Sequence, residues 1–262
     1  MWLALLTGVF AMPVHATIIF QENFSYPVGG LNGNNGGTGF TAAWTAAATA
    51  TIAAGNIGQA SPVLNISGNN VAQATRAFGT YNGDNIYVGF FIRWQTGAIA
   101  TNDTLLLFLD NGAAPSASFG ITGSTTTDFI GRTQLPGAGQ TASSGVAAES
   151  TNYFIVIRLS KSTSGVGNPY NTISLWVNPT IGSLGSPDAT SLVDVTAGLA
   201  TSLSRLGIYT SGLNVSGGGI DHVWVDGILA GDAWTDFFVP EPSTWALTAA
   251  GLLYCLRRFR KR

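Results

Sequence analysis

The side chains that could do chemistry in this chain are few, and their spacing limits what they can do. Glycoside hydrolysis uses two carboxylates that flank the scissile bond, about 5 Å apart in retaining enzymes. Between residues 17 and 239 the only glutamates are Glu22 and Glu149, and neither has an acidic residue two or four positions away. Asp221 and Asp226 are five positions apart, so a regular strand would point them to opposite faces. Catalysis by a carboxylate pair is therefore not expected.

A nucleophilic site would have to use His222, the one histidine beyond residue 16. Hydrolases of this kind place their serine in a Gly-x-Ser-x-Gly turn, and no such turn accompanies this histidine. The sequence predicts that the protein is not an enzyme and needs no cofactor.

Aromatic residues are the better candidates for a binding role. Trp176, Tyr209 and Trp224 lie on predicted strands, and exposed rings could stack on sugar rings while polar neighbours such as His222 bind hydroxyl groups. Trp176 shares its strand face with Ser174 and Asn178, and Trp224 shares its face with His222 and Asp226, so both faces are expected to be polar and wet. The same rings could equally fill a core. For Trp94 the core is the expectation.

Charge and metal-ligand patterns exclude other classes of function. Residues 17–239 hold six basic and twelve acidic residues, a formal charge of −6, with the basic residues scattered singly. Nucleic-acid binding needs a clustered positive surface, so it is not expected. Asp103 and Asp110 bracket one predicted strand and are weak candidates for Ca²⁺ ligands, although both fit ordinary turn chemistry.

These side chains must be positioned by β-strands. Short apolar runs alternate with clusters of Gly, Asn and Pro, which is typical of an antiparallel β-sandwich. We expect strands at 18–24, 70–78, 85–94, 104–109, 116–121, 152–160, 172–178, 204–209 and 220–228. One or two weak strands could lie in the small-residue region 42–58. Residues 17–238 are long enough to bury a core as a single domain.

The two ends of the chain read as export signals. Residues 2–12 are apolar, and Val14-His15-Ala16 has the small-residue pattern of a signal-peptidase site, which predicts a signal peptide over residues 1–16. At the other end, Pro240-Glu241-Pro242 precedes a short apolar helix and a terminal cluster of five Arg and Lys residues. Thirteen helical residues span roughly 20 Å, against about 30 Å of bilayer hydrocarbon, so this helix is marginal as a permanent anchor.

Residues 239–262, with Pro240, Glu241 and Pro242 as the motif, resemble the PEP-CTERM sorting signal of Gram-negative bacteria. The resemblance implies export with signal peptidase and exosortase as processing partners. It also implies transient anchoring in the inner membrane by the C-terminal transmembrane helix, then delivery to the cell envelope or extracellular matrix. Proteins with this signal accompany exopolysaccharide and biofilm production.

A second resemblance spans the domain itself. Its opening and closing segments resemble secreted domains with a concanavalin A-like, LamG-type jelly roll, through residues 22–26, 29–31, 34–40, Trp44, 220–226 and 233–234. That family implies an all-β sandwich in which the first and last strands pair. The preferred function is a non-catalytic structural or adhesive protein of an exopolysaccharide matrix. The alternative is a carbohydrate-binding, lectin-like module or a diverged glycanase.

Overall fold

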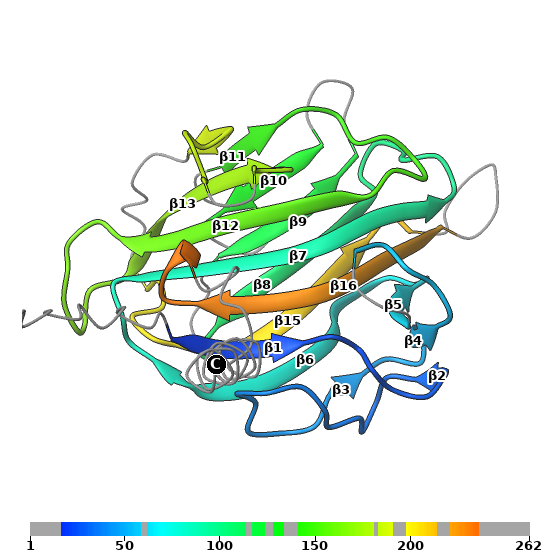
Figure 1. Cartoon of the computed structure of the whole chain (residues 1–262), viewed down its shortest axis with the longest axis horizontal. Helices are drawn as coiled ribbons and strands as arrows, with labels where there is room; N and C mark the ends of the chain where they lie inside the picture. Colours follow the sequence, from blue (N-terminus) through cyan, green and yellow to red (C-terminus); the bar gives the residue numbers. More distant parts are fainter. Residues whose placement is uncertain are drawn as a thin grey trace, which may run out of the picture.

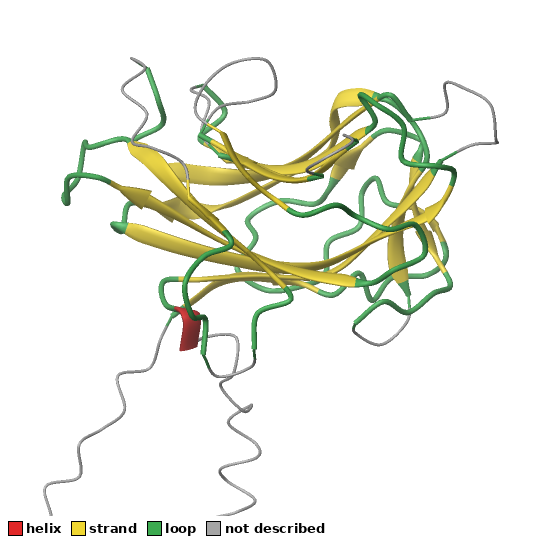
Figure 2. Cartoon of the chain, turned by 90° about the horizontal axis from the view of Figure 1, so that it is seen from above, coloured by secondary structure: helices red, strands yellow, loops and turns green. Residues whose placement is uncertain are grey.

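The structure is a computed structural model, and it describes residues 17–58, 62–113, 117–123, 128–133, 141–180, 183–190, 198–213 and 221–235. The signal peptide, the sorting motif and the apolar helix expected from the sequence lie outside these residues. Among the residues that are described, no helix is long and apolar enough to cross a membrane. The described chain is all-β, with one 3₁₀ turn at 234–235 (Figure 2).

Two antiparallel sheets pack face to face, which confirms the predicted β-sandwich (Figures 1 and 2). The nine-stranded sheet has the order β14-β13-β12-β7-β16-β5-β4-β2, with β1 also paired to β16. Its strands are β1 Ile18–Glu22, β2 Gly29–Gly30, β4 Ala50–Ala53, β5 Val63–Ile66, β7 Asn85–Thr96, β12 Tyr153–Lys161, β13 Tyr170–Val177, β14 Ala189–Thr190 and β16 His222–Gly231.

The seven-stranded sheet lies behind it in Figure 1 and has the order β11-β10-β9-β8-β15-β6-β3. Its strands are β3 Thr45–Ala46, β6 Asn70–Tyr81, β8 Thr104–Asp110, β9 Ser118–Thr122, β10 Phe129–Arg132, β11 Thr141–Ser144 and β15 Leu203–Ser211. All nine strands expected from the sequence are present. The region 42–58 contains β3 and β4, as anticipated, whereas β2, β5, β10, β11 and β14 were not anticipated.

The first and last strands lie side by side. β1 pairs antiparallel with β16, with Ile18 opposite Gly231 and Glu22 opposite Ile228 (Figure 1). Beyond this ladder, Thr17 N–H donates to Asp232 Oδ1 at 3.0 Å. The pairing of terminal strands implied by the jelly-roll resemblance is therefore present.

The core fills the space between the sheets and follows the alternation of the strands. On β7, Ile92 and Trp94 point into the core, whereas Phe91 and Arg93 point to the outer face. On β13, Ile173 and Leu175 are in the core, which confirms the alternation predicted there. Trp94 is fully buried, as expected. The residues that alternate with these core positions therefore make up the outer face of the nine-stranded sheet.

Candidate functional site

A row of four polar and aromatic side chains crosses the outer face of the nine-stranded sheet. The register places Arg93 on β7 opposite Trp224 on β16, Trp224 opposite Asn65 on β5, and Asn65 opposite Thr51 on β4. The residues next to them on each strand are buried in the core, so alternation turns these four outward. We call Arg93, Trp224, Asn65 and Thr51 the Trp224 row.

Asn65 is the hydrogen-bonding centre of this row. Its Oδ1 accepts a bond from Trp224 Nε1 at 3.2 Å and lies 3.0 Å from His222 Nδ1, while its Nδ2 donates to Thr51 Oγ1 at 3.1 Å. Because Asn65 Oδ1 can only accept, His222 Nδ1 must carry the proton. In the neutral imidazole His222 Nε2 is then an acceptor, and it makes no hydrogen bond in the described part of the chain.

The Trp224 indole is held from two sides. The guanidinium carbon of Arg93 lies 5.7 Å from the ring centroid, within the range of a cation–π contact. Gly55, in the connection from β4 to β5, packs on the ring edge, where an added Cβ would lie 2.9 Å from Cζ3. The ring is half-buried, so part of its surface remains open to solvent.

Arg93 has no carboxylate partner among the described residues. Its Nε is buried without a hydrogen bond, and its guanidinium forms no ion pair with any residue that the structure describes. Beside it on the outer face, Phe91 packs against Phe154 in a tilted arrangement, with 4.8 Å between ring centroids. This surface therefore offers aromatic rings, a hydrogen-bond acceptor at His222 and unused donors at Arg93.

Trp176 does not join the Trp224 row. It points to the same outer face, but β12 and β7 lie between its strand and β16. The segment after β13, described at residues 178–180 and 183–188, folds over it and leaves 4% of the residue exposed, and Trp176 Nε1 donates to Gly185 O at 3.3 Å. The expectation that Trp176 and Ser174 lie on a wet face is wrong, because this segment covers the strand. A cavity of about 360 Å³ remains between Trp176 and residues 177–180, 183–186 and Asp188.

Tyr209 lies on the other sheet. It is half-buried on the outer face of β15, where alternation turns Leu206 and Ile208 into the core. It interacts electrostatically with Arg132, on β10, whose pKa is lowered by burial. Of the four candidate ligand-binding residues, only His222 and Trp224 are brought together.

The two candidate Ca²⁺ ligands are at opposite ends of β8. Asp110 makes a bidentate ion pair with Arg205, at 2.7 and 2.5 Å, and also accepts from Gly112 N–H. Asp103 Oδ2 accepts from Ala100 N–H at 2.6 Å, and burial raises the pKa of its carboxyl. They cannot share an ion, and no group of three potential metal ligands occurs in the part of the chain that the structure describes.

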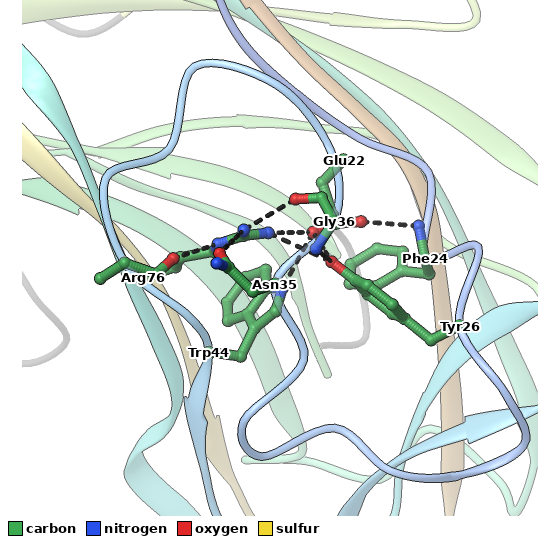
Figure 3. A network of polar contacts seen from close by, with 8 residues as sticks. Glu22, Phe24, Tyr26, Asn35, Gly36, Trp44 and Arg76 are labelled. Atoms are coloured by element: carbon green, nitrogen blue, oxygen red, sulfur yellow. Dashed lines mark hydrogen bonds and ion pairs between the residues drawn. The ribbon is translucent and has the colours of Figure 1, made fainter.

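Glu22 is the centre of a buried network that sequence reasoning missed (Figure 3). Its Oε1 accepts from Phe24 N–H at 2.8 Å, and its Oε2 accepts from Tyr26 Oη, Trp44 Nε1 and Arg76 Nη1 at 2.7, 2.9 and 2.5 Å. Burial, followed by the bond to Glu22, raises the pKa of the Tyr26 phenol. Glu22 is 1% exposed and cannot reach a substrate.

Arg76 completes the network from β6. Its Nε donates to Ala42 O at 2.8 Å, and its Nη2 donates to Asn35 Oδ1 and Gly36 O at 2.9 and 2.7 Å. Its guanidinium also lies 4.0 Å from the centroid of the Phe40 ring. The network ties the Gly-rich segment after β1 to the edge of the core, which is a structural role.

The sequence offered partial signals for the residues it missed. Asn65 interrupts an apolar run, Val63-Leu64-Ile66, at the position that faces outward. Its meeting with Trp224 depends on a register between strands 159 positions apart, which no local pattern reveals.

No protein-family model and no curated protein matches the sequence. Among solved structures, the binding domain of botulinum neurotoxin serotype C1 aligns with 82% of this chain and 48% of its own, at 12% identity and a TM-score of 0.51. The binding domain of botulinum neurotoxin DC, in complex with SialylT, aligns with 82% of this chain and 48% of its own, at 11% identity and a TM-score of 0.50. Botulinum neurotoxin type C, whose cell entry depends on interaction with two ganglioside molecules, aligns over 78% of this chain and 47% of its own. Its identity is 12% and its TM-score is 0.50.

The chain spans about half the length of these toxin chains. At 11–12% identity the likeness shows a shared β-sandwich fold. Function on such a fold has to be argued from the residues of each site.

Proposed function

We propose that the protein is a non-catalytic, exported glycan-binding module with an adhesive role in an exopolysaccharide matrix. The observation that carries this proposal is the Trp224 row. A half-buried indole is fixed by Asn65 and Arg93, and it presents an apolar surface beside polar groups. Sugar-binding sites combine these two elements, since the ring packs on the sugar face and the polar groups bind hydroxyls.

Preorganisation supports a binding role for this surface. Asn65 is fixed through both ends of its side-chain amide, so the Trp224 and His222 rings are held before any ligand arrives. A site that is already ordered loses less conformational entropy on binding. The related fold in botulinum neurotoxin type C occurs in a protein that interacts with ganglioside molecules, which fits this class of ligand.

A glycan array probed with the purified protein tests the proposal. We expect at least one polysaccharide class to bind, and Trp224→Ala to weaken that binding by about tenfold or more. Tyr209→Ala is the matched control, because it removes a half-buried aromatic side chain from the opposite sheet. A blank array, or equal losses from both substitutions, would count against the Trp224 row as a glycan site.

Export and sorting form a separate part of the proposal. The resemblance of residues 239–262 to a PEP-CTERM signal supports processing by exosortase and delivery to the envelope or matrix. In a Gram-negative host, replacing Pro240, Glu241 and Pro242 with alanine should leave the protein in the inner-membrane fraction. Unchanged appearance in the matrix fraction would contradict this assignment.

A purely structural role is the second candidate. The Glu22 network favours it, because a buried, fully bonded ion pair holds a long segment rigid without serving any ligand. In this case the array would be blank while deletion of the gene would still weaken the matrix.

A further inference from the structure

Four of the six basic residues between 17 and 239 form no ion pair with an acidic residue that the structure describes. Arg76 pairs with Glu22, Arg205 pairs with Asp110, and Lys161 donates to the carbonyls of Asn82 and Gly165. The remaining three cations, which form no ion pair with any described residue, are Arg93, Arg132 and Arg158. In a body with a formal charge of −6, unpaired and partly buried arginines need an explanation.

Two of these arginines lie on the same outer face. Arg158 on β12 is opposite Tyr87 on β7, and Arg93 is six residues further along β7. At about 3.3 Å per residue the two arginines are roughly 20 Å apart along the strand. Each has a buried Nε without a hydrogen bond, and the one bond that the Arg158 guanidinium makes among the described residues is a long one, 3.4 Å, to Ser174 Oγ.

Aromatic rings fill the space between them. The Phe91–Phe154 pair lies on the rungs between Arg158 and Arg93, and Trp224 lies beside Arg93. Tyr87, Phe91, Arg93, Phe154, Arg158 and Trp224 therefore form an arginine–aromatic strip across β12, β7 and β16.

Among the described residues, one carboxylate lies beside this strip. Of the outward positions on β7, β12 and β16 that border it, the only acidic one that the structure describes is Asp226. Asp226 is 0% exposed, and its Oδ1 accepts from Gly227 N–H at 2.7 Å. The solvent side of the strip therefore carries positive charge on an acidic domain.

From this arrangement we infer that the strip binds an anionic polysaccharide, one that carries carboxylate groups along its chain. This inference rests on the proposed glycan-binding function and names its substrate class. A guanidinium binds a carboxylate through two parallel N–H donors, and the guanidinium groups of Arg93 and Arg158 would supply such donors. Because the two arginines are roughly 20 Å apart, the strip fits a chain of several sugar units better than a single sugar.

Binding of polygalacturonate, measured by calorimetry with the full-length protein at low and high salt, tests the inference. Neutral dextran and dextran sulfate of matched length serve as comparison ligands. We expect polygalacturonate to bind more tightly than dextran and to weaken with salt. Arg93→Gln and Arg158→Gln should each cost about tenfold, the size of one charge-assisted hydrogen bond.

Arg132→Gln is the matched control, because it removes an equally unpaired arginine from the other sheet. It should leave the affinity unchanged. An equal loss from Arg132→Gln, or equal competition by single-stranded DNA, would overturn the inference in favour of unspecific attraction. If dextran sulfate binds more tightly than polygalacturonate, the ligand is still an anionic polysaccharide, but its charged group is sulfate and the carboxylate assignment is wrong.

The two proposals fail in distinguishable ways. If dextran binds as well as polygalacturonate, and Trp224→Ala weakens both while the arginine variants do not, the glycan function stands and the anionic class is wrong. If neither charged nor neutral polysaccharide binds, both proposals are wrong.

Discussion

Arg76 Nη1 lies 2.5 Å from Glu22 Oε2, and both side chains are 1% exposed. One residue comes from the first strand and the other from the seven-stranded sheet, so the ion pair links the two layers through the core edge. The donors around the carboxylate come from three segments, because Phe24 and Tyr26 follow β1, Trp44 precedes β3 and Arg76 lies on β6 (Figure 3).

Removing one member of this pair should be costly. Glu22→Gln leaves a buried guanidinium without its counter-charge, so we expect the free energy of unfolding to fall by about 3–5 kcal/mol. Urea denaturation measures the change. The double variant Glu22→Gln/Arg76→Met removes both charges and should recover part of the loss. A single-variant change below about 1 kcal/mol would mean that solvent reaches the pair.

Two glycines of the seven-stranded sheet should respond differently to alanine. At Gly207 an added Cβ would lie 2.0 Å from Cζ of the buried Phe108 ring, so the ring or the strand must move. We expect Gly207→Ala to destabilise by roughly 1–3 kcal/mol. At Gly79, on the neighbouring strand β6, no heavy atom lies within 4 Å of the added Cβ. Gly79→Ala should therefore leave the stability unchanged or raise it slightly. Thermal melts of the two variants and the wild-type protein measure the difference.

Asp103 should make stability depend on pH. Burial raises its pKa above 3.8, the Ala100 N–H opposes the shift, and the Asp221 carboxylate adds to it. The folded state then holds the proton more tightly than the unfolded chain, so this contribution to stability is present at low pH and is lost as pH rises through the folded pKa.

Asp103→Asn cannot ionise, so it should raise Tm at pH 7 by up to about 4 °C. The gain should shrink towards pH 3, where the wild-type carboxyl is protonated. Calorimetric scans at pH 3, 5 and 7 measure this difference. A gain that grows at low pH would show that the sign is wrong.

Trp176 should matter for stability rather than for binding. Its indole is covered by residues 178–180 and 183–188, so Trp176→Ala should lower the free energy of unfolding by about 3–5 kcal/mol. Trp224→Ala should cost less, because that ring is only half-buried. Parallel denaturation and glycan-binding curves for the two variants measure both effects. Loss of binding in Trp176→Ala at unchanged stability would reverse the two roles.

The strand pattern was predictable from sequence because alternation is local. Ile173 and Leu175 point inward and Trp176 points outward, as a period of two requires. The covering of Trp176 was not predictable, since the segment after β13 is polar and carries no sign that it folds back. β5 and β10 were missed because strands of four residues leave too short a run to show alternation.

The candidate site was predictable only in part. His222 and Trp224 share a strand, so their proximity follows from spacing alone. Asn65, Arg93 and Arg158 reach the same face through registers between distant strands, which depend on the packing of the whole sheet. The Glu22–Arg76 pair, 54 positions apart, was invisible for the same reason.

The pairing of β1 with β16 also sets an order of events during folding. Thr17 and Asp232 are bonded although 215 positions separate them, and β16 is the one strand that β1 pairs with among the described elements. In a chain that is synthesised from its N-terminus, β1 therefore cannot form its ladder until β16 has been made. Such non-local closure is slow. The domain therefore cannot finish folding before its last strand, β16, is available to pair with β1.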